Sequence, residues 1–153
     1  MSIEARLAEL GIGLPKAAAP AANYVPFVHH GGLLHIAGQI PFRADGSLVL
    51  GRLGETMDVA TGQAAARLCG LGILAQAKAA LGSLDRVARI LKLGVFVAST
   101  VDFTQQPEVA NGASDLMVEV FGDIGRHARS AVGVPVLPRG VAVEVDAVIA
   151  VAD

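Results

Sequence analysis

The sequence predicts an α+β domain in which a mixed β-sheet carries two main helices on one of its faces. Short apolar runs typical of strands lie near both ends of the chain, and two stretches of helical length lie between them. A further apolar run separates these two stretches, so the predicted order is strand, strand, helix, strand, helix, strand, strand. With 153 residues, no internal repeat and no domain linker, the chain is expected to form one domain over residues 1–153.

The first 23 residues are predicted to form a helix and a linker in front of the sheet. Residues 2–10 combine a helical spacing of apolar side chains with Ser2 as a suitable N-cap, and Gly11 follows as a stop. Residues 17–23 are mostly alanine and include Pro20, and this run of small residues is predicted to be a linker.

A β-hairpin is predicted next. Residues 24–28 and 33–38 read as strands, and Gly31 with Gly32 supplies the turn between them. Pro26 lacks an N–H donor, so the first of these strands is expected at the edge of the sheet. Residues 41–54 fit either a third short strand or an ordered loop.

The centre of the chain predicts a helix, a strand and a second helix. Residues 58–81 are rich in alanine and lack proline, and Gly82 supplies a stop. Residues 93–98 form an uninterrupted apolar run, which predicts a strand buried on both faces. Residues 107–122 begin with a proline suited to a first helical turn and keep apolar side chains at helical spacing.

The tail of the chain predicts a terminal hairpin. Residues 128–136 and 141–151 are β-branched runs on either side of the sequence Leu-Pro-Arg-Gly at positions 137–140. Proline and glycine there fit the second and fourth positions of a type I turn. We therefore expect the two runs to pair with each other.

Composition excludes several functions and compartments. The net charge of −2 and 4% aromatic content disfavour binding to nucleic acid. Prolines, glycines, histidines and amide side chains interrupt residues 17–42, the longest stretch without a formal charge, so we expect no membrane span. A single cysteine fits a reducing, cytoplasmic setting. The 53% hydrophobic content in so short a chain predicts apolar surface buried between subunits, and hence an oligomer.

Several residues that often carry chemistry favour a structural interpretation. Cys69 lies inside a predicted helix among apolar neighbours, where a thiol is usually a packing residue. The four histidines (His29, His30, His35 and His127) lack convincing ligand spacing, so we expect no metal site and interpret them as solvated loop residues. The Gly-Leu-Gly-Ile-Leu-Ala sequence at positions 70–75 lies within a helix, not at the strand-to-helix turn that a dinucleotide fingerprint needs.

Two charged residues, Arg129 and Glu144, interrupt tail strands that are otherwise largely apolar. An arginine fork binds a carboxylate through two parallel hydrogen bonds, and a glutamate in a dry cleft has its pKa raised toward the value for general acid or base catalysis. Such a pair can hold and hydrate a small acid. The alternatives are a structural ion pair, or an Arg129 that simply begins its strand at the surface.

The predicted hairpin fixes the relation of these two residues. If the strands pair across the turn at 137–140, Glu144 faces Gly133, roughly four residues or ~13 Å along the strand from Arg129. An even offset places both side chains on one face of the sheet. They would then line opposite ends of one cleft or meet partners from a neighbouring subunit.

Four sequence patterns resemble the RidA family, also called YjgF or endoribonuclease L-PSP proteins. They are Ala-Gly-Gln-Ile-Pro at 37–41, Ala-Arg-Ser-Ala-Val at 128–132, Leu-Pro at 137–138 and Val-Glu-Val at 143–145. The resemblance extends from about residue 24 to the C-terminus. The arginine and glutamate separated by Leu-Pro are its most specific part.

The resemblance implies a chorismate-mutase-like fold and a homotrimer with clefts between its subunits. It also implies a cofactor-free enamine/imine deaminase that converts intermediates such as 2-aminoacrylate to a 2-oxo acid and ammonia. By the same resemblance Arg129 binds the substrate carboxylate and Glu144 orients or activates water. Tyr24 is then a wall of the cleft, and Gly38 a backbone contact to the substrate.

Two alternatives to the deaminase stay open. Ala37 and Ala131 stand where family deaminases often carry serine and cysteine, and the loss of these polar groups favours a module that binds small carboxylates without turnover. The third hypothesis is the ribonuclease or translation-inhibitor role that one of the family's names implies, which the charge and aromatic content disfavour.

Overall fold

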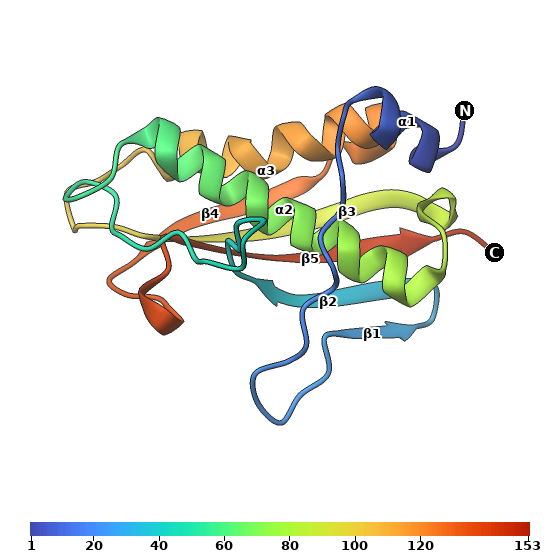
Figure 1. The fold of residues 1–153 in the computed structure, drawn as a ribbon, viewed down its shortest axis with the longest axis horizontal. Coiled ribbons are helices and arrows are strands. Elements are labelled where there is room, and N and C mark those ends of the chain that lie inside the picture. The colour runs from blue at the N-terminus through green and yellow to red at the C-terminus, as the bar shows by residue number, and fades with distance from the viewer.

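The protein, described over residues 1–153 by a computed structural model, contains one five-stranded sheet of order β1-β2-β5-β3-β4 (Figure 1). Its strands are β1 (Phe27–His30), β2 (Leu33–Gln39), β3 (Val87–Ala98), β4 (Ala128–Val134) and β5 (Val143–Val151). All neighbouring strands are antiparallel except β3 and β4, which are parallel. The mixed sheet of an α+β domain is therefore confirmed.

Three α-helices and three short 3₁₀ turns complete the fold. The helices are α1 (Ile3–Glu9), α2 (Val59–Leu81) and α3 (Gln106–Phe121), and the turns are η1 (Leu84–Arg86), η2 (Gly122–Gly125) and η3 (Pro138–Gly140). Figure 1 shows α2 and α3 side by side over one face of the sheet. The two predicted main helices and their common face are confirmed.

Local hydrogen bonds explain where the helices begin. The Ser2 hydroxyl accepts from the Ala5 amide at 3.0 Å, and the Asp58 carboxylate accepts from the Thr61 amide at 2.8 Å. Both contacts satisfy amides that have no partner inside the first turn. α2 ends at Gly82, whose φ of 79° lies in the left-handed region that glycine adopts without strain.

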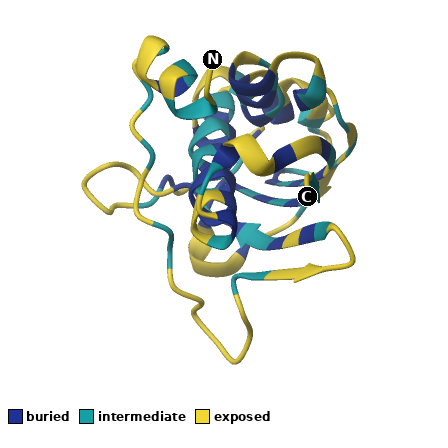
Figure 2. Ribbon diagram, turned by 90° about the vertical axis from the view of Figure 1, so that its right-hand side faces the viewer, coloured by how far each residue is buried: buried dark blue, intermediate teal, exposed yellow.

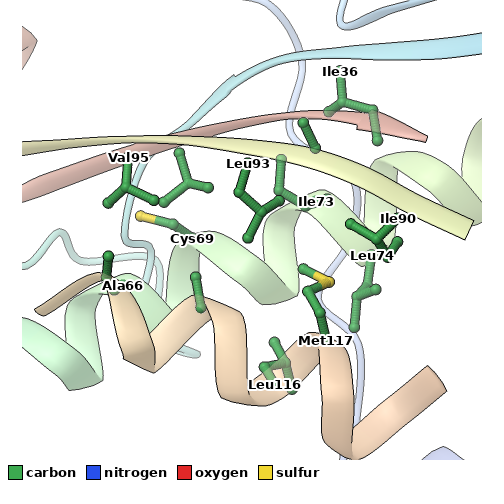
Figure 3. Close-up of a cluster of buried hydrophobic side chains, with 14 of the residues drawn as sticks. Ile36, Ala66, Cys69, Ile73, Leu74, Ile90, Leu93, Val95, Leu116 and Met117 are labelled. Carbon is green, nitrogen blue, oxygen red and sulfur yellow. The ribbon is translucent and has the colours of Figure 1, made fainter. Parts of the chain in front are cut away.

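The hydrophobic core lies between the two helices and the sheet (Figure 3). Ile73 and Leu74 of α2 and Leu116 of α3 are fully buried there, together with Leu93 of β3. Cys69 is buried among them, and burial followed by the charge of Glu144 raises the pKa of its thiol well above the ordinary value. Its interpretation as an inert packing residue agrees with this environment.

α2 is long and apolar enough to cross a membrane by length and composition alone. However, 56% of its most apolar window is buried inside the protein. It packs against the sheet on one side and α3 on the other. Its apolar content is thereby accounted for by the core.

The α2–α3 contact predicts a strong effect of one methyl group. A Cβ at Gly112 of α3 would overlap the backbone carbonyl of Gln63 in α2, and backbone atoms cannot rotate away. We expect Gly112→Ala to cost about 2–3 kcal/mol in urea unfolding, despite the better helix propensity of alanine. Gly13→Ala is the control, because nothing lies within 4 Å of its Cβ. Equal stability of the two variants would contradict this packing.

The predicted terminal hairpin is wrong. β3 lies between β4 and β5, and it pairs in parallel with β4 and antiparallel with β5. The turn itself exists, since the Gly140 amide donates to the Leu137 carbonyl at 3.0 Å. Its third residue, Arg139, has a φ of 63°, as in type II rather than type I turns.

Contacts outside the turn explain why β4 and β5 separate. The Ala142 amide donates to Val49, and the Ala142 carbonyl accepts from Ala98. Leu50 also forms a β-bridge with Val141. The segment before β5 is thus held by residues 49–50 and the end of β3, so β5 enters the sheet between β2 and β3. Sequence position in a turn could not reveal these long-range partners.

The face of the sheet opposite the helices is open. The predicted burial of residues 93–98 on both faces is therefore incorrect for the isolated chain, where Gly94 and Phe96 are only half-buried. The strand registers place on this face, among others, the residues Val28, His35, Lys92, Gly94, Phe96, Ser130, Val132, Glu144, Asp146 and Val148. Its apolar members are the surface that an oligomer would cover.

The remaining predictions concern the N-terminal hairpin. β1 is an edge strand, as Pro26 predicts, but it begins only at Phe27, so residues 24–26 precede it. Residues 41–54 form an ordered loop with isolated bridges, not a third strand. Figure 2 shows the largely exposed segment of residues 15–25 that connects α1 to β1.

Candidate functional site

A cavity of about 510 Å³ lies at the edge of β2, beyond the point where β1 begins at Phe27. β1 pairs only with residues 33–36, so the last part of β2 has no neighbouring strand along this edge. The cavity is bounded by the exposed segment of residues 18–22, by β2 and by the η3 turn. Its size falls in the range of small-molecule sites.

Glu144 supplies the acidic side chain of this cavity. It lies on β5 opposite Phe96, on the open face of the sheet. Burial, followed by repulsion from Asp146 two residues later, raises the pKa of the Glu144 carboxyl above its ordinary value. A raised pKa suits this carboxyl group to accept and return a proton.

Gly38 and Tyr24 join Glu144 in the same cavity. The α-carbon of Gly38 faces the Glu144 side chain directly, because a Cβ at this position would overlap the carboxylate. Tyr24 is 49% exposed and forms part of the wall. The structure thus brings together three of the four predicted site residues.

Gly38 therefore offers a test of the position of Glu144. We expect Gly38→Ala to fold, because the carboxylate that a new methyl group would meet is the end of a flexible side chain. The displaced carboxylate should slow about tenfold or more any reaction that depends on the position of Glu144, since misplacement of a reacting group by 1 Å can cost about 100-fold. Comparison of melting temperature with reaction rate checks this prediction, and an unchanged rate would contradict it.

Other residues of the cavity were not singled out from the sequence. Gln76 of α2 is 1% exposed and donates to the Ala18 carbonyl at 2.7 Å, which ties the exposed segment to the core. Arg139 of the η3 turn also lines the cavity. Its positive φ has no sequence signal, because arginine rarely adopts this conformation.

Arg129 lies elsewhere. It lies on β4, pairs with Leu93 of β3 and points to the helix side of the sheet. There its Nη1 donates to Asn111 Oδ1 at 2.8 Å and to Ser114 Oγ at 3.0 Å. These two contacts use both N–H groups of Nη1. Nε and Nη2 donate to no group of the chain, so the edge that binds carboxylates in two parallel bonds is free.

The groups around Arg129 were largely missed from the sequence. Asn111 and Ser114 are three residues apart, which places them on one face of α3. His127 precedes Arg129 by two residues, and its Nε2 lies 2.9 Å from the Ser114 hydroxyl. The interpretation of His127 as a solvated loop residue is wrong, because it is half-buried and its Nδ1 also contacts the Gly125 carbonyl at 2.7 Å. The signals available in the sequence were the three-residue spacing of Asn111 and Ser114 and the two-residue spacing of His127 and Arg129.

Arg129 and Glu144 do not share a face of the sheet. Their partners on β3, Leu93 and Phe96, are three residues apart and point to opposite sides. The expected common face followed from direct pairing of β4 with β5. In the structure β3 lies between these two strands, so they do not pair. No ion pair joins the two residues, so the structural ion-pair alternative is also wrong. Within one chain the guanidinium lies on the edge strand β4 and the carboxylate beside the opposite edge.

Comparisons with known proteins agree with this fold. A family model described as "YjgF/chorismate_mutase-like, putative endoribonuclease" matches residues 4–148. Protein TCP17 of Trypanosoma cruzi is 56% identical over 148 residues, which cover 96% of this chain and 92% of TCP17.

Two solved structures show the same similarity in three dimensions. The protein Atu1372 of Agrobacterium tumefaciens is 50% identical with a TM-score of 0.90, over 97% of this chain and 92% of that one. Escherichia coli TdcF, solved with bound serine, is 27% identical with a TM-score of 0.63, over 92% of this chain and 98% of that one. On the extent of the family match and the identity to TCP17, the chain belongs to the YjgF/chorismate-mutase-like family.

Proposed function

We propose that the protein is a cofactor-free hydrolase of 2-imino acids and their enamine tautomers, acting in clefts between the subunits of a homotrimer. The observation that carries this proposal is the division of the site into two halves at opposite edges of one sheet. A free guanidinium fork lies at β4, and a half-buried carboxylate lies in the cavity beside β2.

The two halves fit a ring of subunits. When one edge of a subunit meets the opposite edge of the next, the interface is heterologous, and it closes into a ring if the rotation permits. Arg129 of one subunit then meets the cavity with Glu144 of its neighbour. The apolar side chains of the open sheet face supply surface that such an assembly would bury. The family resemblance implies three subunits.

The chemistry of a 2-imino acid matches both halves. Its carboxylate accepts two hydrogen bonds from Nε and Nη2 of Arg129, which fixes the neighbouring C=N carbon. A water molecule held by the Glu144 carboxylate attacks this carbon. As the C–O bond forms, Glu144 takes a proton from the water and passes it to the nitrogen. In the resulting carbinolamine, the Glu144 carboxylate takes the hydroxyl proton and returns it to the amino group. The C–N bond then breaks as the C=O bond forms, which releases ammonia and the 2-oxo acid.

An enamine such as 2-aminoacrylate needs one earlier step. A proton added to its terminal carbon, with an N–H proton lost, converts it to the imine, and a carboxyl group of raised pKa can supply that proton. The serine bound in TdcF has the same three-carbon skeleton and carboxylate. This ligand supports a small amino or imino acid as the occupant here.

A coupled assay tests the reaction. 2-Aminoacrylate and a bulkier 2-imino acid are generated in situ, and release of the 2-oxo acid is followed with and without the protein. Wild-type protein should accelerate release. Binding of 2-oxo acids by a folded oligomer without acceleration would favour the carboxylate-binding module, for which Ala37 in the cavity lining is the supporting observation. Labelled RNA in parallel should stay intact, and its cleavage by highly purified protein would favour the ribonuclease.

Subunit mixing tests the division of the site. Arg129→Ala and Glu144→Gln chains are each expected to be inactive alone. After joint unfolding and refolding, a mixed trimer contains one site with both native residues, so random mixing should restore about one quarter of wild-type activity. The same variants mixed without unfolding are the control. If both residues acted within one chain, refolded mixtures would remain inactive.

A further inference from the structure

The surroundings of Arg129 contain a hydrogen-bonded chain of four groups. The Gly125 carbonyl contacts His127 Nδ1, His127 Nε2 contacts the Ser114 hydroxyl, and Ser114 Oγ accepts from Arg129 Nη1. Gly125 belongs to η2, Ser114 to α3 and Arg129 to the start of β4, and His127 lies in the connection between η2 and β4. Of these four hydrogen-bonded groups, only Arg129 belongs to the site proposed above.

The direction of each hydrogen bond follows from the groups present. A carbonyl oxygen only accepts, so His127 Nδ1 carries the proton and Nε2 presents a lone pair. The Ser114 hydroxyl donates its one hydrogen to Nε2, which leaves the oxygen lone pairs for Arg129. Burial is the main cause that lowers the pKa of His127, and the neighbouring Arg129 charge adds to it, so the neutral ring is favoured.

We propose that His127 and Ser114 are positioning residues that hold Arg129 with its Nε/Nη2 edge free for the substrate carboxylate. Asn111 occupies the other Nη1 hydrogen at 2.8 Å. A long arginine side chain otherwise samples many rotamers, and fixing it in advance removes that entropy cost from binding. This inference rests on the proposed role of Arg129 as the carboxylate-binding residue.

Matched pairs of variants separate the hydrogen bond from the shape of each side chain. Ser114→Thr and Ser114→Val have the same shape and differ in the hydroxyl group. His127→Gln retains an acceptor for Ser114, whereas His127→Met fills similar space without one. Thr104→Val repeats the hydroxyl-to-methyl change at an exposed residue that makes no hydrogen bond through its side chain, and it serves as the control.

The expected effect is on binding rather than turnover. Ser114→Val and His127→Met should each raise KM for the 2-imino acid about tenfold and leave kcat within about twofold, because the carboxylate contact is made in both ground and transition state. Ser114→Thr, His127→Gln and Thr104→Val should keep KM close to wild type. The double variant Ser114→Val/His127→Met should raise KM no further than either single change, since both break one chain.

A spectroscopic readout reports the chain directly. ¹⁵N NMR of the imidazole should show His127 in the Nδ1–H form, with an Nε2 signal that moves in Ser114→Val and not in Ser114→Thr. Additive KM effects of the two variants, or equal KM in the Thr and Val variants, would overturn the positioning role while the hydrolase stands. If wild-type protein neither hydrolyses imines nor binds 2-oxo acids, the proposed function itself fails, and this role fails with it.

Discussion

Arg129→Ala is expected to lower kcat/KM for 2-imino acids by about 100-fold to 1000-fold, in line with the loss of a hydrogen-bonded charge pair. The variant should also lose measurable binding of 2-oxo acids, which share the carboxylate but cannot be hydrolysed further. The physical reason is the loss of the free Nε/Nη2 edge of the guanidinium. Isothermal calorimetry with pyruvate and the coupled assay measure the two effects.

Two further variants sharpen this result. Arg129→Lys keeps the charge but lacks the planar fork, so its loss should be intermediate. Arg67→Ala is the matched control, because Arg67 also reaches α3, where it pairs with Glu119 at 3.1 Å, outside either half of the site. Retained 2-oxo acid affinity in Arg129→Ala would show that the carboxylate binds elsewhere.

Glu144→Gln is expected to lower kcat by about 10² to 10⁴-fold, the usual contribution of a general base, while 2-oxo acid binding persists. Glutamine has nearly the same shape but cannot take a proton from water. In the wild type, kcat should fall on acidification with a midpoint above the ordinary glutamate value of 4.5, because burial and Asp146 raise the pKa of the Glu144 carboxyl. Substantial turnover by the glutamine variant would remove Glu144 from the mechanism.

The same substitution should stabilise the protein slightly. A raised pKa in the folded state means that folding disfavours the charged carboxylate, so stability is lost as pH rises from 4.5 through the folded-state pKa. The neutral glutamine avoids this loss, and its melting temperature should exceed that of wild type at pH 7 but not below pH 4.5. Asp146→Asn serves as a comparison, because the pKa of the Asp146 carboxyl is also raised. Unlike Glu144, Asp146 also accepts a hydrogen bond from the Gly94 amide.

Local structure could be predicted from the sequence, and strand pairing could not. Ser2, Asp58 and Gly82 mark helix ends through contacts within a few residues, which sequence spacing encodes. The place of β5 depends on hydrogen bonds of residues 98 and 142 with partners far along the chain. A turn sequence between two β-branched runs carries no information on such partners, so the hairpin prediction failed.

The candidate site shows the same division. Glu144 was named from the charge pattern of its strand and Gly38 and Tyr24 from the family resemblance, and the structure gathers all three in one cavity. The common face for Arg129 and Glu144 was deduced from direct pairing of the two tail strands. That prediction was wrong because these strands do not pair. His127 was misjudged because its partner, Ser114, comes from a helix whose packing against β4 the sequence does not state.

If the proposed site is shared between subunits, the location of its two halves at opposite edges of the sheet would make abundance a control of activity. In a single chain these two groups lie on opposite faces of the sheet. Subunit association obeys mass action, so dilution below the dissociation constant of the ring would silence folded chains without any inhibitor. A cell with few copies would hold a reserve of dormant chains, and a modest rise in synthesis would raise output more than proportionally.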